Sequence, residues 1–243
     1  MAITTKALKE KASTIVKNVN GCTNFGGVAM NGKKMYTIKT KSDNKQSTIS
    51  VYNNYKSTTR SNHLFNNCLG HGNDLTYYNG KLYVAPCDKY VEMIDVKSWK
   101  HTRLDTAGLT CCAIAHYQNN QFFLSGGGNP KFTITLAELK GTKFVVIKRW
   151  TVTNPKAGAG YTIFQGMGYS KDTNKTYNII SHSNLKSSII LRTPIGASTP
   201  DLIRTSKNGG SYKYEFESLD FGPGGKYVIA VNRSGKSDCI VSA

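Results

Sequence analysis

The stretch GHGNDLTYYNGKLYVAP (Gly70–Pro86) places a short polar cluster before two hydrophobic runs that flank an Asn-Gly pair at 79–80. Asn and Gly both tolerate the positive φ angles of a type I′ turn, so this pair between apolar runs predicts a β-hairpin. The polar residues before the hairpin are His71, Asn73 and Asp74. They form either part of a functional site or the inner end of a repeated structural unit.

Four other stretches share this pattern of small or polar residues, an apolar–x–apolar triplet, a turn and a hydrophobic strand. The five stretches are FGGVAMNGKKMYTIK (Phe25–Lys39), GNDLTYYNGKLYVAP (Gly72–Pro86), CAIAHYQNNQFFLSG (Cys112–Gly126), QGMGYSKDTNKTYNIIS (Gln165–Ser181) and ESLDFGPGGKYVIAVN (Glu217–Asn232). Their triplets begin at positions 28, 75, 114, 167 and 219, so the steps are 47, 39, 53 and 52 residues. A period of about 40–50 residues with several short strands per unit is typical of β-propeller blades.

The fifth unit supplies fewer strand-like runs than the others before the sequence stops, whereas STIVKNV (Ser13–Val19) is a strand-like run before the first unit. We therefore predict an all-β, single-domain, five-bladed β-propeller whose last blade is closed by the N-terminal strand, which removes free sheet edges. The predicted blades span 21–65, 66–108, 109–157, 158–210, and 211–243 together with 13–19. For the preceding segment TKALKEKAS (Thr5–Ser13), a helix of one or two turns is an alternative interpretation.

The residues just before each triplet are expected near the central channel, where small side chains fit the crowding of converging strands. Asn73, Asp74, Gln165 and Glu217 are the polar members of this set and predict a polar cluster at one channel mouth. Asp74 and Glu217 are candidates for an acid–base pair or for ligands of Ca²⁺; the alternative is that inner-strand amides satisfy both carboxylates. His71 is a ligand contact or general base, or else it hydrogen-bonds neighbouring backbone and fixes the strand entrance.

The charge balance is strongly basic, because 32 Lys and Arg face 14 Asp and Glu, for a formal net charge of +18. Such an excess predicts a polyanionic partner: nucleic acid, a phosphate-rich cell-wall polymer or an acidic membrane surface. The alternative is a solvated basic surface. Trp99, Trp150 and Tyr212 lie near Lys and Arg, where aromatic rings suit stacking on sugars or bases, or packing between blades.

Several other classes of site find no support in the sequence. The six cysteines form no CxxC pair, which argues against structural zinc and favours free thiols; a nucleophilic Cys112 with His116 is the alternative. No GxSxG, Walker, HExxH or DxDxDG motif occurs, and no cofactor is predicted. Since no apolar run suits a membrane span or a secretory signal, we predict a chain made in the cytoplasm, then virion-associated or released by a route such as lysis.

The GHGNDLTY segment, the later QGMGY segment and five repeats of this length resemble the five-bladed propellers of phage receptor-binding proteins of Gram-positive hosts and of helveticin-type bacteriocins. In those proteins a GHxND or GHxN stretch opens one inner strand, and a QG pair opens another. The resemblance covers most of the chain by repeat pattern and about a dozen residues by motif. It implies a non-catalytic, carbohydrate-binding domain for cell-surface recognition. The chain differs from them in its large basic excess and in lacking a long N-terminal stem.

These observations favour a binding module for an anionic cell-surface glycopolymer. Lys and Arg would pair with phosphates, and aromatic faces would contact sugars. Two alternatives stay open: a glycan or phosphodiester hydrolase or lyase at the channel mouth, and a nucleic-acid-binding phage protein that uses the same basic surface.

Overall fold

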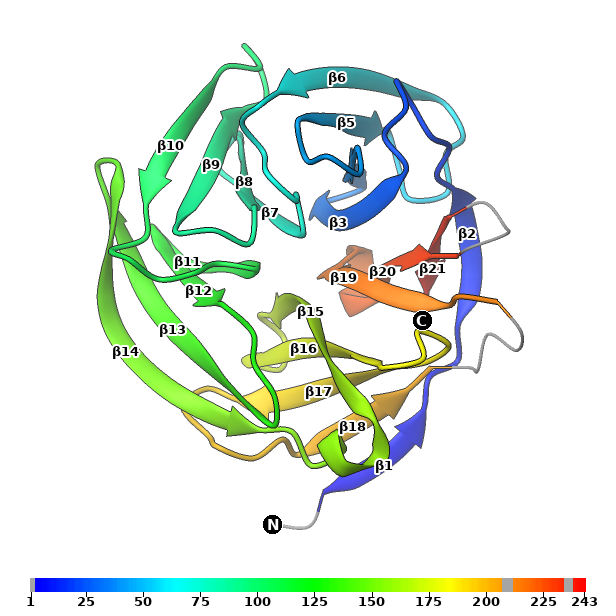
Figure 1. Cartoon of the computed structure of the whole chain (residues 1–243), viewed down its shortest axis with the longest axis vertical. Helices are drawn as coiled ribbons and strands as arrows, with labels where there is room; N and C mark the ends of the chain where they lie inside the picture. The colour runs from blue at the N-terminus through cyan, green and yellow to red at the C-terminus, as the bar shows by residue number, and fades with distance from the viewer. Residues whose placement is uncertain (1–2, 207–211, 234–237) are drawn as a thin grey trace.

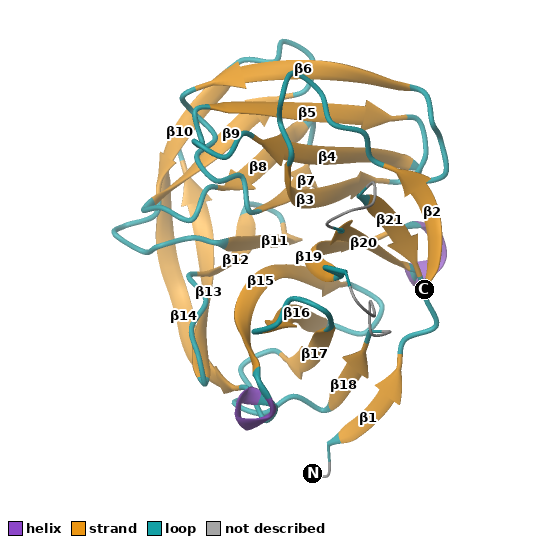
Figure 2. Ribbon diagram, turned by 45° about the vertical axis from the view of Figure 1, so that its right-hand side comes forward, coloured by secondary structure: helices purple, strands orange, loops and turns teal. Residues whose placement is uncertain are grey.

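The computed structural model describes residues 3–206, 212–233 and 238–243 of the chain. Its regular structure is β-sheet, with 3₁₀ turns at Ala157–Ala159 and Pro223–Gly225 (Figure 2). The predicted all-β class is therefore confirmed. Within the described residues, no helix has the length and apolar character needed to cross a bilayer.

The described strands form five antiparallel meanders of four strands each, arranged round a ring with one strand of each meander nearest the centre (Figure 1). The first meander comprises β3 (Asn24–Asn31), β4 (Lys34–Thr40), β5 (Gln46–Tyr52) and β6 (Arg60–Asn66). The second comprises β7 (Asp74–Tyr78), β8 (Lys81–Ala85), β9 (Tyr90–Asp95) and β10 (His101–Asp105). The third comprises β11 (Ala113–Gln118), β12 (Gln121–Ser125), β13 (Lys131–Lys140) and β14 (Lys143–Thr153).

The last two meanders involve both ends of the chain. The fourth comprises β15 (Tyr161–Ser170), β16 (Lys175–His182), β17 (Ser188–Pro194) and β18 (Leu202–Thr205), with β1 (Thr4–Ala7) added in parallel beside β18. The fifth comprises β19 (Glu215–Phe221), β20 (Tyr227–Asn232), β21 (Cys239–Ser242) and β2 (Lys11–Ile15). The second and third meanders share one eight-stranded sheet, because β10 and β14 form a parallel pair at Asp105 and Lys143. The result is an all-β, propeller-like ring.

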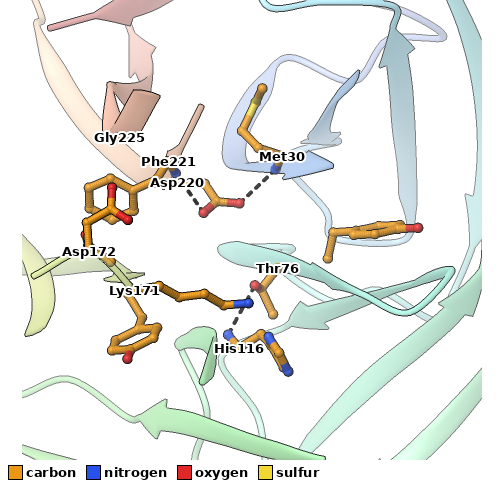
Figure 3. A pocket seen from close by; sticks show the side chains of 11 residues that line it. Met30, Thr76, His116, Lys171, Asp172, Asp220, Phe221 and Gly225 are labelled. Carbon is orange, nitrogen blue, oxygen red and sulfur yellow. Dashed lines mark hydrogen bonds between the residues drawn. The ribbon is translucent and has the colours of Figure 1, made fainter. Parts of the chain in front are cut away.

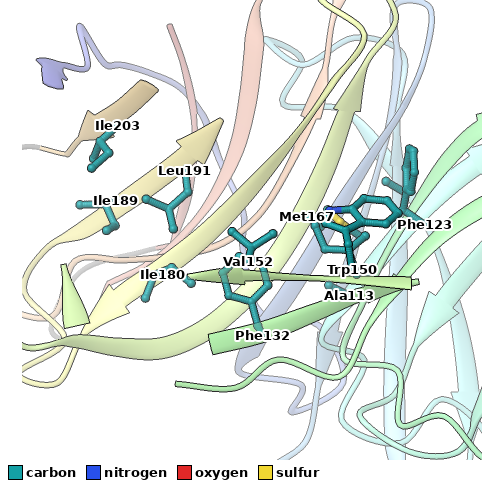
Figure 4. Packing of buried hydrophobic residues seen from close by; sticks show 12 residues of the cluster. Ala113, Phe123, Phe132, Trp150, Val152, Met167, Ile180, Ile189, Leu191 and Ile203 are labelled. Atoms are coloured by element: carbon teal, nitrogen blue, oxygen red, sulfur yellow. The ribbon is translucent and has the colours of Figure 1, made fainter. Parts of the chain in front are cut away.

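The core is divided into five hydrophobic clusters, each of which lies between two neighbouring meanders. Between the third and fourth meanders, for example, Phe123 and Trp150 face Met167 and Ile180 (Figure 4). Another cluster joins the fifth meander to the first and so completes the ring. Because each sheet buries both faces against its neighbours, middle strands such as β4, β5 and β16 are buried along most of their length, with Ser, Thr and Asn among the apolar residues.

Small residues open the inner strands where the backbones approach closely, as the sequence predicts. A Cβ atom placed on Gly26 would lie 1.8 Å from the carbonyl oxygen of Gly72, and one on Gly166 would lie 2.6 Å from that of Glu217. No side chain fits at either position. These glycines therefore allow the first meander to contact the second, and the fourth to contact the fifth, at the centre of the ring.

The N-terminal segment differs from the sequence-based prediction. The strand expected at 13–19 lies at Lys11–Ile15, because these are the residues that pair with β21; the chain then turns at Asn20 and Gly21, which have φ angles of 53° and 73°. The alternative helix at Thr5–Ser13 is wrong, since the strands β1 and β2 occupy this region. Pairing with β18 and β21 supplies hydrogen bonds that an isolated short helix would lack.

Candidate functional site

The inner strands β3, β7, β11, β15 and β19 give the ring two faces. We call the face where these strands begin the leading face, and the face where they end in hairpin turns the turn face. Asn73 directly precedes β7 and Asp74 begins it, whereas Glu217 is the third residue of β19 and Gln165 lies in the first half of β15, so all four belong to the leading half of the inner strands. The two faces differ in how many of their polar side chains already form hydrogen bonds within the protein.

Asp74 is fully buried, and both of its carboxylate oxygens are occupied by groups from other strands. Oδ2 accepts hydrogen bonds from the N–H groups of Ile114 on β11 and Met167 on β15, each at 3.0 Å. Oδ1 accepts one from the Leu75 N–H at 3.0 Å and one from the Ser218 hydroxyl on β19 at 2.5 Å. Burial raises the pKa of Asp74 to about 8 despite these donors. The carboxylate thus ties four inner strands together, which favours its structural interpretation.

Asn73, Gln165 and Glu217 are also buried and hydrogen-bonded. Asn73 Nδ2 donates to the carbonyl oxygens of Cys112 and Gln165 at 2.9 and 2.6 Å, and Gln165 Nε2 donates to the Glu215 carboxylate. Glu217 accepts a hydrogen bond from Asn232 Nδ2 at 2.9 Å. Burial, with the charge of Glu215, raises the pKa of Glu217 well above its usual value. The polar contacts of Asp74 and of Glu217 are therefore to different partners, rather than to each other.

His71 connects the first two meanders at the leading face. Its ring Nδ1 lies 3.3 Å from Asn44 Oδ1, and its Nε2 lies 3.5 Å from Asn24 Nδ2. This pattern fits a neutral ring that carries its proton on Nδ1. Burial lowers the pKa of His71, which also favours the neutral form. Its backbone N–H donates to the Pro86 carbonyl at 3.3 Å, so the local contacts resemble those of a residue that fixes the strand entrance.

The three aromatic candidates lie in different surroundings. Trp150 is only 8% exposed and packs edge-on against Phe123, so its ring has no open face for a ligand. Trp99 is half-buried and stacks on His63 with ring centroids 3.4 Å apart. Tyr212 is half-buried at the beginning of the segment that leads into β19. Of the basic segment that precedes it in the sequence, residues 207–211 lie outside the described residues.

The cysteines are all free thiols. Cys112 lies at the leading face, where the Cys87 thiol hydrogen-bonds to it and lowers its pKa. His116, in contrast, lines the opposite face of the ring. The alternative Cys112–His116 pair is therefore not brought together. Among the described residues, no three His, Cys, Asp or Glu side chains are grouped so that they could hold a metal ion.

The turn face carries a central hollow of about 270 Å³ that all five meanders line (Figure 3). The second apolar position of every triplet contributes to its wall; these residues are Met30, Tyr77, His116, Tyr169 and Phe221. The other lining residues are Thr76, Ser170, Lys171, Asp172, Asp220 and Gly225. The hollow thus combines aromatic surfaces with hydroxyl, carboxylate and ammonium groups.

Asp220 is the carboxylate held most firmly in this hollow. Its two oxygens accept hydrogen bonds from the N–H groups of Met30 and Phe221, both at 2.7 Å, so the carboxylate joins the fifth meander to the first. Burial raises the pKa of Asp220 to about 6, against the effect of the two backbone donors. The group therefore changes its charge close to neutral pH.

His116 forms part of the opposite wall of the hollow. Its ring stacks on Tyr78 with centroids 3.8 Å apart, and Nε2 donates to the Asn119 carbonyl at 2.9 Å. The neutral ring then carries its proton on Nε2, which leaves Nδ1 as an acceptor. Burial, with a smaller contribution from the charge of Lys171, lowers the pKa of His116. The His116 side of the hollow therefore favours a neutral imidazole ring.

Five lysines stand on or next to the hairpin turns that follow the inner strands, on the turn face, and one of them, Lys171, lines the hollow. They are Lys33, Lys34, Lys81, Lys171 and Lys226, and they come from four of the five meanders. We call them the rim lysines. All are at least partly exposed, and none takes part in an ion pair within the described part of the chain. Among the described residues, the turn face thus carries unpaired cations together with a hollow that contains hydrogen-bonding and aromatic groups.

Sequence reasoning placed the candidate site at the other end of the same strands and missed Asp220 and Lys171. The signal was present in the repeat itself, because the second apolar position of each triplet faces the hollow; Asp220 directly precedes one of these positions, and Lys171 follows another by two residues. In a strand, side chains of alternate residues point to opposite sides, so the triplets identify residues that reach the centre at the turn face.

The known proteins that resemble this chain resemble it in fold alone. No protein-family model and no curated protein matches the sequence, so the resemblance to phage and bacteriocin propellers stays a prediction. A glutaminyl cyclase from Myxococcus xanthus is similar in structure, with 13% identity, a TM-score of 0.66 and coverage of 99% of this chain and 97% of that chain. The allergen Mala s 1 from Malassezia sympodialis has 12% identity and a TM-score of 0.53, with coverage of 90% and 78%. A luciferin-regenerating enzyme has 8% identity and a TM-score of 0.51, with coverage of 92% of both chains. With these neighbours, the chain is an all-β protein of β-propeller-like fold.

Proposed function

We propose that the chain is a five-bladed β-propeller that binds an anionic cell-surface glycopolymer without catalysis. Five meanders with five interfaces between them support the blade count, and the pairing of β2 with β21 supports closure by the N-terminal strand. The shared eight-stranded sheet is then two blades that touch at the single β10–β14 pair. A phage receptor-binding or bacteriocin-like role follows from the resemblance in sequence.

The observation that carries the binding proposal is the group of rim lysines on the turn face, which also carries the hollow. Tyr77, Tyr169 and Phe221 offer apolar ring surfaces to a sugar, while Asp220 and Asp172 can accept hydrogen bonds from its hydroxyl groups. The rim lysines stand on the same face and can pair with phosphates of a longer chain. A repeating sugar phosphate or polyol phosphate, as in teichoic acids, combines the two kinds of group.

The leading face fits this role less well. Its predicted residues His71, Asn73, Asp74, Gln165 and Glu217 already have protein partners. A ligand there would have to replace buried hydrogen bonds, which costs the desolvation of each group left unpaired. We therefore assign the proposed ligand to the turn face.

The test uses immobilised poly(glycerol phosphate) teichoic acid and the triple variant Lys33→Ala, Lys34→Ala, Lys171→Ala. We expect the affinity to fall at least about tenfold, because three phosphate contacts are lost. The matched control replaces Lys45, Lys89 and Lys131, which are exposed on the leading-face side of the ring, and so removes the same charge. If both triple variants lose affinity equally, the binding is a general effect of net charge and the proposed site is wrong.

A second candidate function is an enzyme that acts in the same hollow. Asp220 favours it, because a carboxyl group with a pKa of about 6 can serve as a general acid or base at neutral pH. Turnover of a glycan or phosphodiester substrate that is lost in Asp220→Asn, with unchanged melting temperature, would support the enzyme. Retention of teichoic acid without turnover supports the binding module. A gel shift with nucleic acid that is as tight as the binding of teichoic acid would instead favour the nucleic-acid-binding alternative.

A further inference from the structure

The outer wall of the third meander carries an apolar strip that the central hollow does not explain. On β14, the three consecutive residues Val145, Val146 and Ile147 are 43%, 36% and 48% exposed. The other large hydrophobic side chains exposed to this degree in the described part of the chain are Ile15 and Leu64, which stand singly on β2 and β6. Isolated exposed apolar residues are ordinary, whereas contiguous ones mark interaction surfaces.

The strip lies on a sheet edge that is open over most of its length. Strand β14 pairs with β13 along its length, but it pairs with β10 only at Lys143, and the Thr153 N–H donates to the Ser198 carbonyl at 2.9 Å. Figure 1 shows β14 as the outermost strand on this side of the ring. Between these two ends, no strand among the described residues pairs with the outer side of β14.

A β-bulge interrupts this edge in the middle of the strip. Leu136 pairs with Lys148 and Ala137 pairs with Val146, so Ile147 is an extra residue on β14. A bulge bends and twists an edge strand, which disfavours the regular addition of another strand. Because side chains alternate along a strand, Val145 and Val146 point to opposite faces of the sheet, so the apolar residues lie on both sides of an irregular edge rather than lining a groove for an extended peptide.

Cations flank the apolar residues on both sides. Lys140 and Lys143 precede the three apolar residues. Lys140 pairs with Glu138 at 3.1 Å and Lys143 with Asp105 at 3.5 Å, and all four side chains are at least 39% exposed. Lys148 and Arg149 follow the apolar residues, are exposed, and make no ion pair among the described residues. A second copy of the chain is a poor occupant, because two molecules of net charge +18 repel each other.

We propose that residues 143–149 of β14, which we call the docking strip, bind the surface of an anionic lipid bilayer. The aliphatic side chains would enter the interfacial region, while Lys143, Lys148 and Arg149 contact the headgroup phosphates. The strip lies in the half of β14 that follows the β13–β14 turn, on the same side of the ring as the turn face. A docked molecule would hold the hollow beside the lipid surface.

The test is flotation with vesicles of phosphatidylcholine that contain about 30% phosphatidylserine, compared with vesicles of phosphatidylcholine alone. We expect the protein to float with the anionic vesicles and not with the neutral ones. The double variant Val145→Thr, Ile147→Thr keeps the charge and the β-branched shape of both residues. It should lower the partition coefficient by about tenfold, because two apolar contacts with the interface are weakened.

Two further variants locate the effect. Lys148→Gln with Arg149→Gln should reduce flotation by about tenfold at low salt, because two headgroup contacts are lost. Ile15→Thr with Leu64→Thr removes the same kind of apolar surface elsewhere and should leave flotation unchanged. The proposal is overturned if the protein does not bind the anionic vesicles, or if the Ile15 and Leu64 control lowers binding as much as the strip variant. It is also overturned if the protein sediments as a dimer that the strip variants convert to a monomer.

The proposed lipid contact and the proposed glycopolymer site can fail separately. The lysine triple variant of the turn face keeps the aliphatic residues of the docking strip, and the strip variant Val145→Thr, Ile147→Thr keeps every rim lysine. Loss of teichoic acid binding in the first variant with retained flotation, and the reverse pattern in the second, would show two independent surfaces.

Discussion

Asp74 accepts hydrogen bonds from β7, β11, β15 and β19, and Ser218, which donates one of them, also accepts a hydrogen bond from the Val28 N–H on β3 at 3.2 Å. One carboxylate and one hydroxyl thus connect all five inner strands. An aspartate after His and Asn in a glycine-flanked segment resembles a catalytic group in sequence. The hydrogen bonds of Asp74 indicate a structural role instead, because its two carboxylate oxygens accept hydrogen bonds from several inner strands at once.

The variant Asp74→Asn should destabilise the fold by about 3 kcal/mol, because an amide group would replace an oxygen that faces buried N–H donors. Urea unfolding followed by tryptophan fluorescence measures this loss. Asp88→Asn is the matched control, since Asp88 is exposed and accepts a local hydrogen bond from the Lys89 N–H. Equal stability of the two variants would contradict the central role of Asp74.

Asp220 should make anion binding at the hollow depend on pH. Its pKa of about 6 means that the group is neutral in mildly acidic solution and negative above that pH. Burial lowers the pKa of His116, so its ring gains a proton only in more acidic solution than an exposed histidine would. We expect affinity for teichoic acid to fall by about fivefold, equivalent to about 1 kcal/mol, as the pH rises from 5 to 7.

The matched variant Asp220→Asn should bind equally at both pH values, and more tightly than the unchanged protein at pH 7. Isothermal titration calorimetry at the two pH values gives both comparisons. The same titration affects stability: because the pKa in the folded state lies above the usual value of 3.8, the stabilisation is complete below about pH 4 and is lost as the pH rises through 6. A persistent pH effect in Asp220→Asn would assign the titration to another group.

The candidate site could be predicted only in part from the sequence. The repeat placed Asn73, Asp74, Gln165 and Glu217 in the leading half of the ring, but it could not show that the fold already uses them. The donors that occupy Asp74 come from residues 40, 93 and 144 positions away. Such long-range hydrogen bonds have no local pattern, so a sequence motif cannot distinguish an open carboxylate from an occupied one.

At the scale of elements, the inner hairpins are the part that the sequence predicts best. The Asn-Gly turn at 79–80 has φ angles of 45° and 76°, so local preference and the final fold agree there. The strand β1 could not be foreseen, because its partner β18 begins at Leu202. The same holds for the boundaries of β2, which depend on β21 at the other end of the chain.

The two N-terminal strands should differ in their importance for stability. All residues of β1 are exposed, so a chain that begins at Leu8 should lose at most about 1 kcal/mol. A chain that begins at Val16 also lacks β2, which leaves β21 as an open edge and exposes the clusters that Leu8 and Thr14 help to cover. We expect it to unfold at a much lower urea concentration or to aggregate. Similar stability of both truncated chains would show that β2 does not close the ring.

At the scale of the whole molecule, the net charge of +18 should dominate the salt dependence of binding. If phosphates of a flexible polymer pair with the rim lysines, raising the salt from about 50 to about 200 mM should lower affinity by at least about tenfold. Loss of three phosphate contacts in Lys33→Ala, Lys34→Ala, Lys171→Ala should make the slope of log K against log salt shallower by about 2. An unchanged slope would mean that these lysines do not contact the polymer.

The pairing of β2 with β21 also sets an order of events during synthesis. The Ser13 hydroxyl on β2 donates to the Ile240 carbonyl on β21, across a separation of 227 residues. Strand β2 is therefore synthesised long before the strand with which it pairs. Until β21 has been synthesised, the nascent chain carries an unpaired β2 and an unfinished fifth sheet. A fold built in this way closes late, and a chaperone that shields β2 during translation would raise the yield of native molecules.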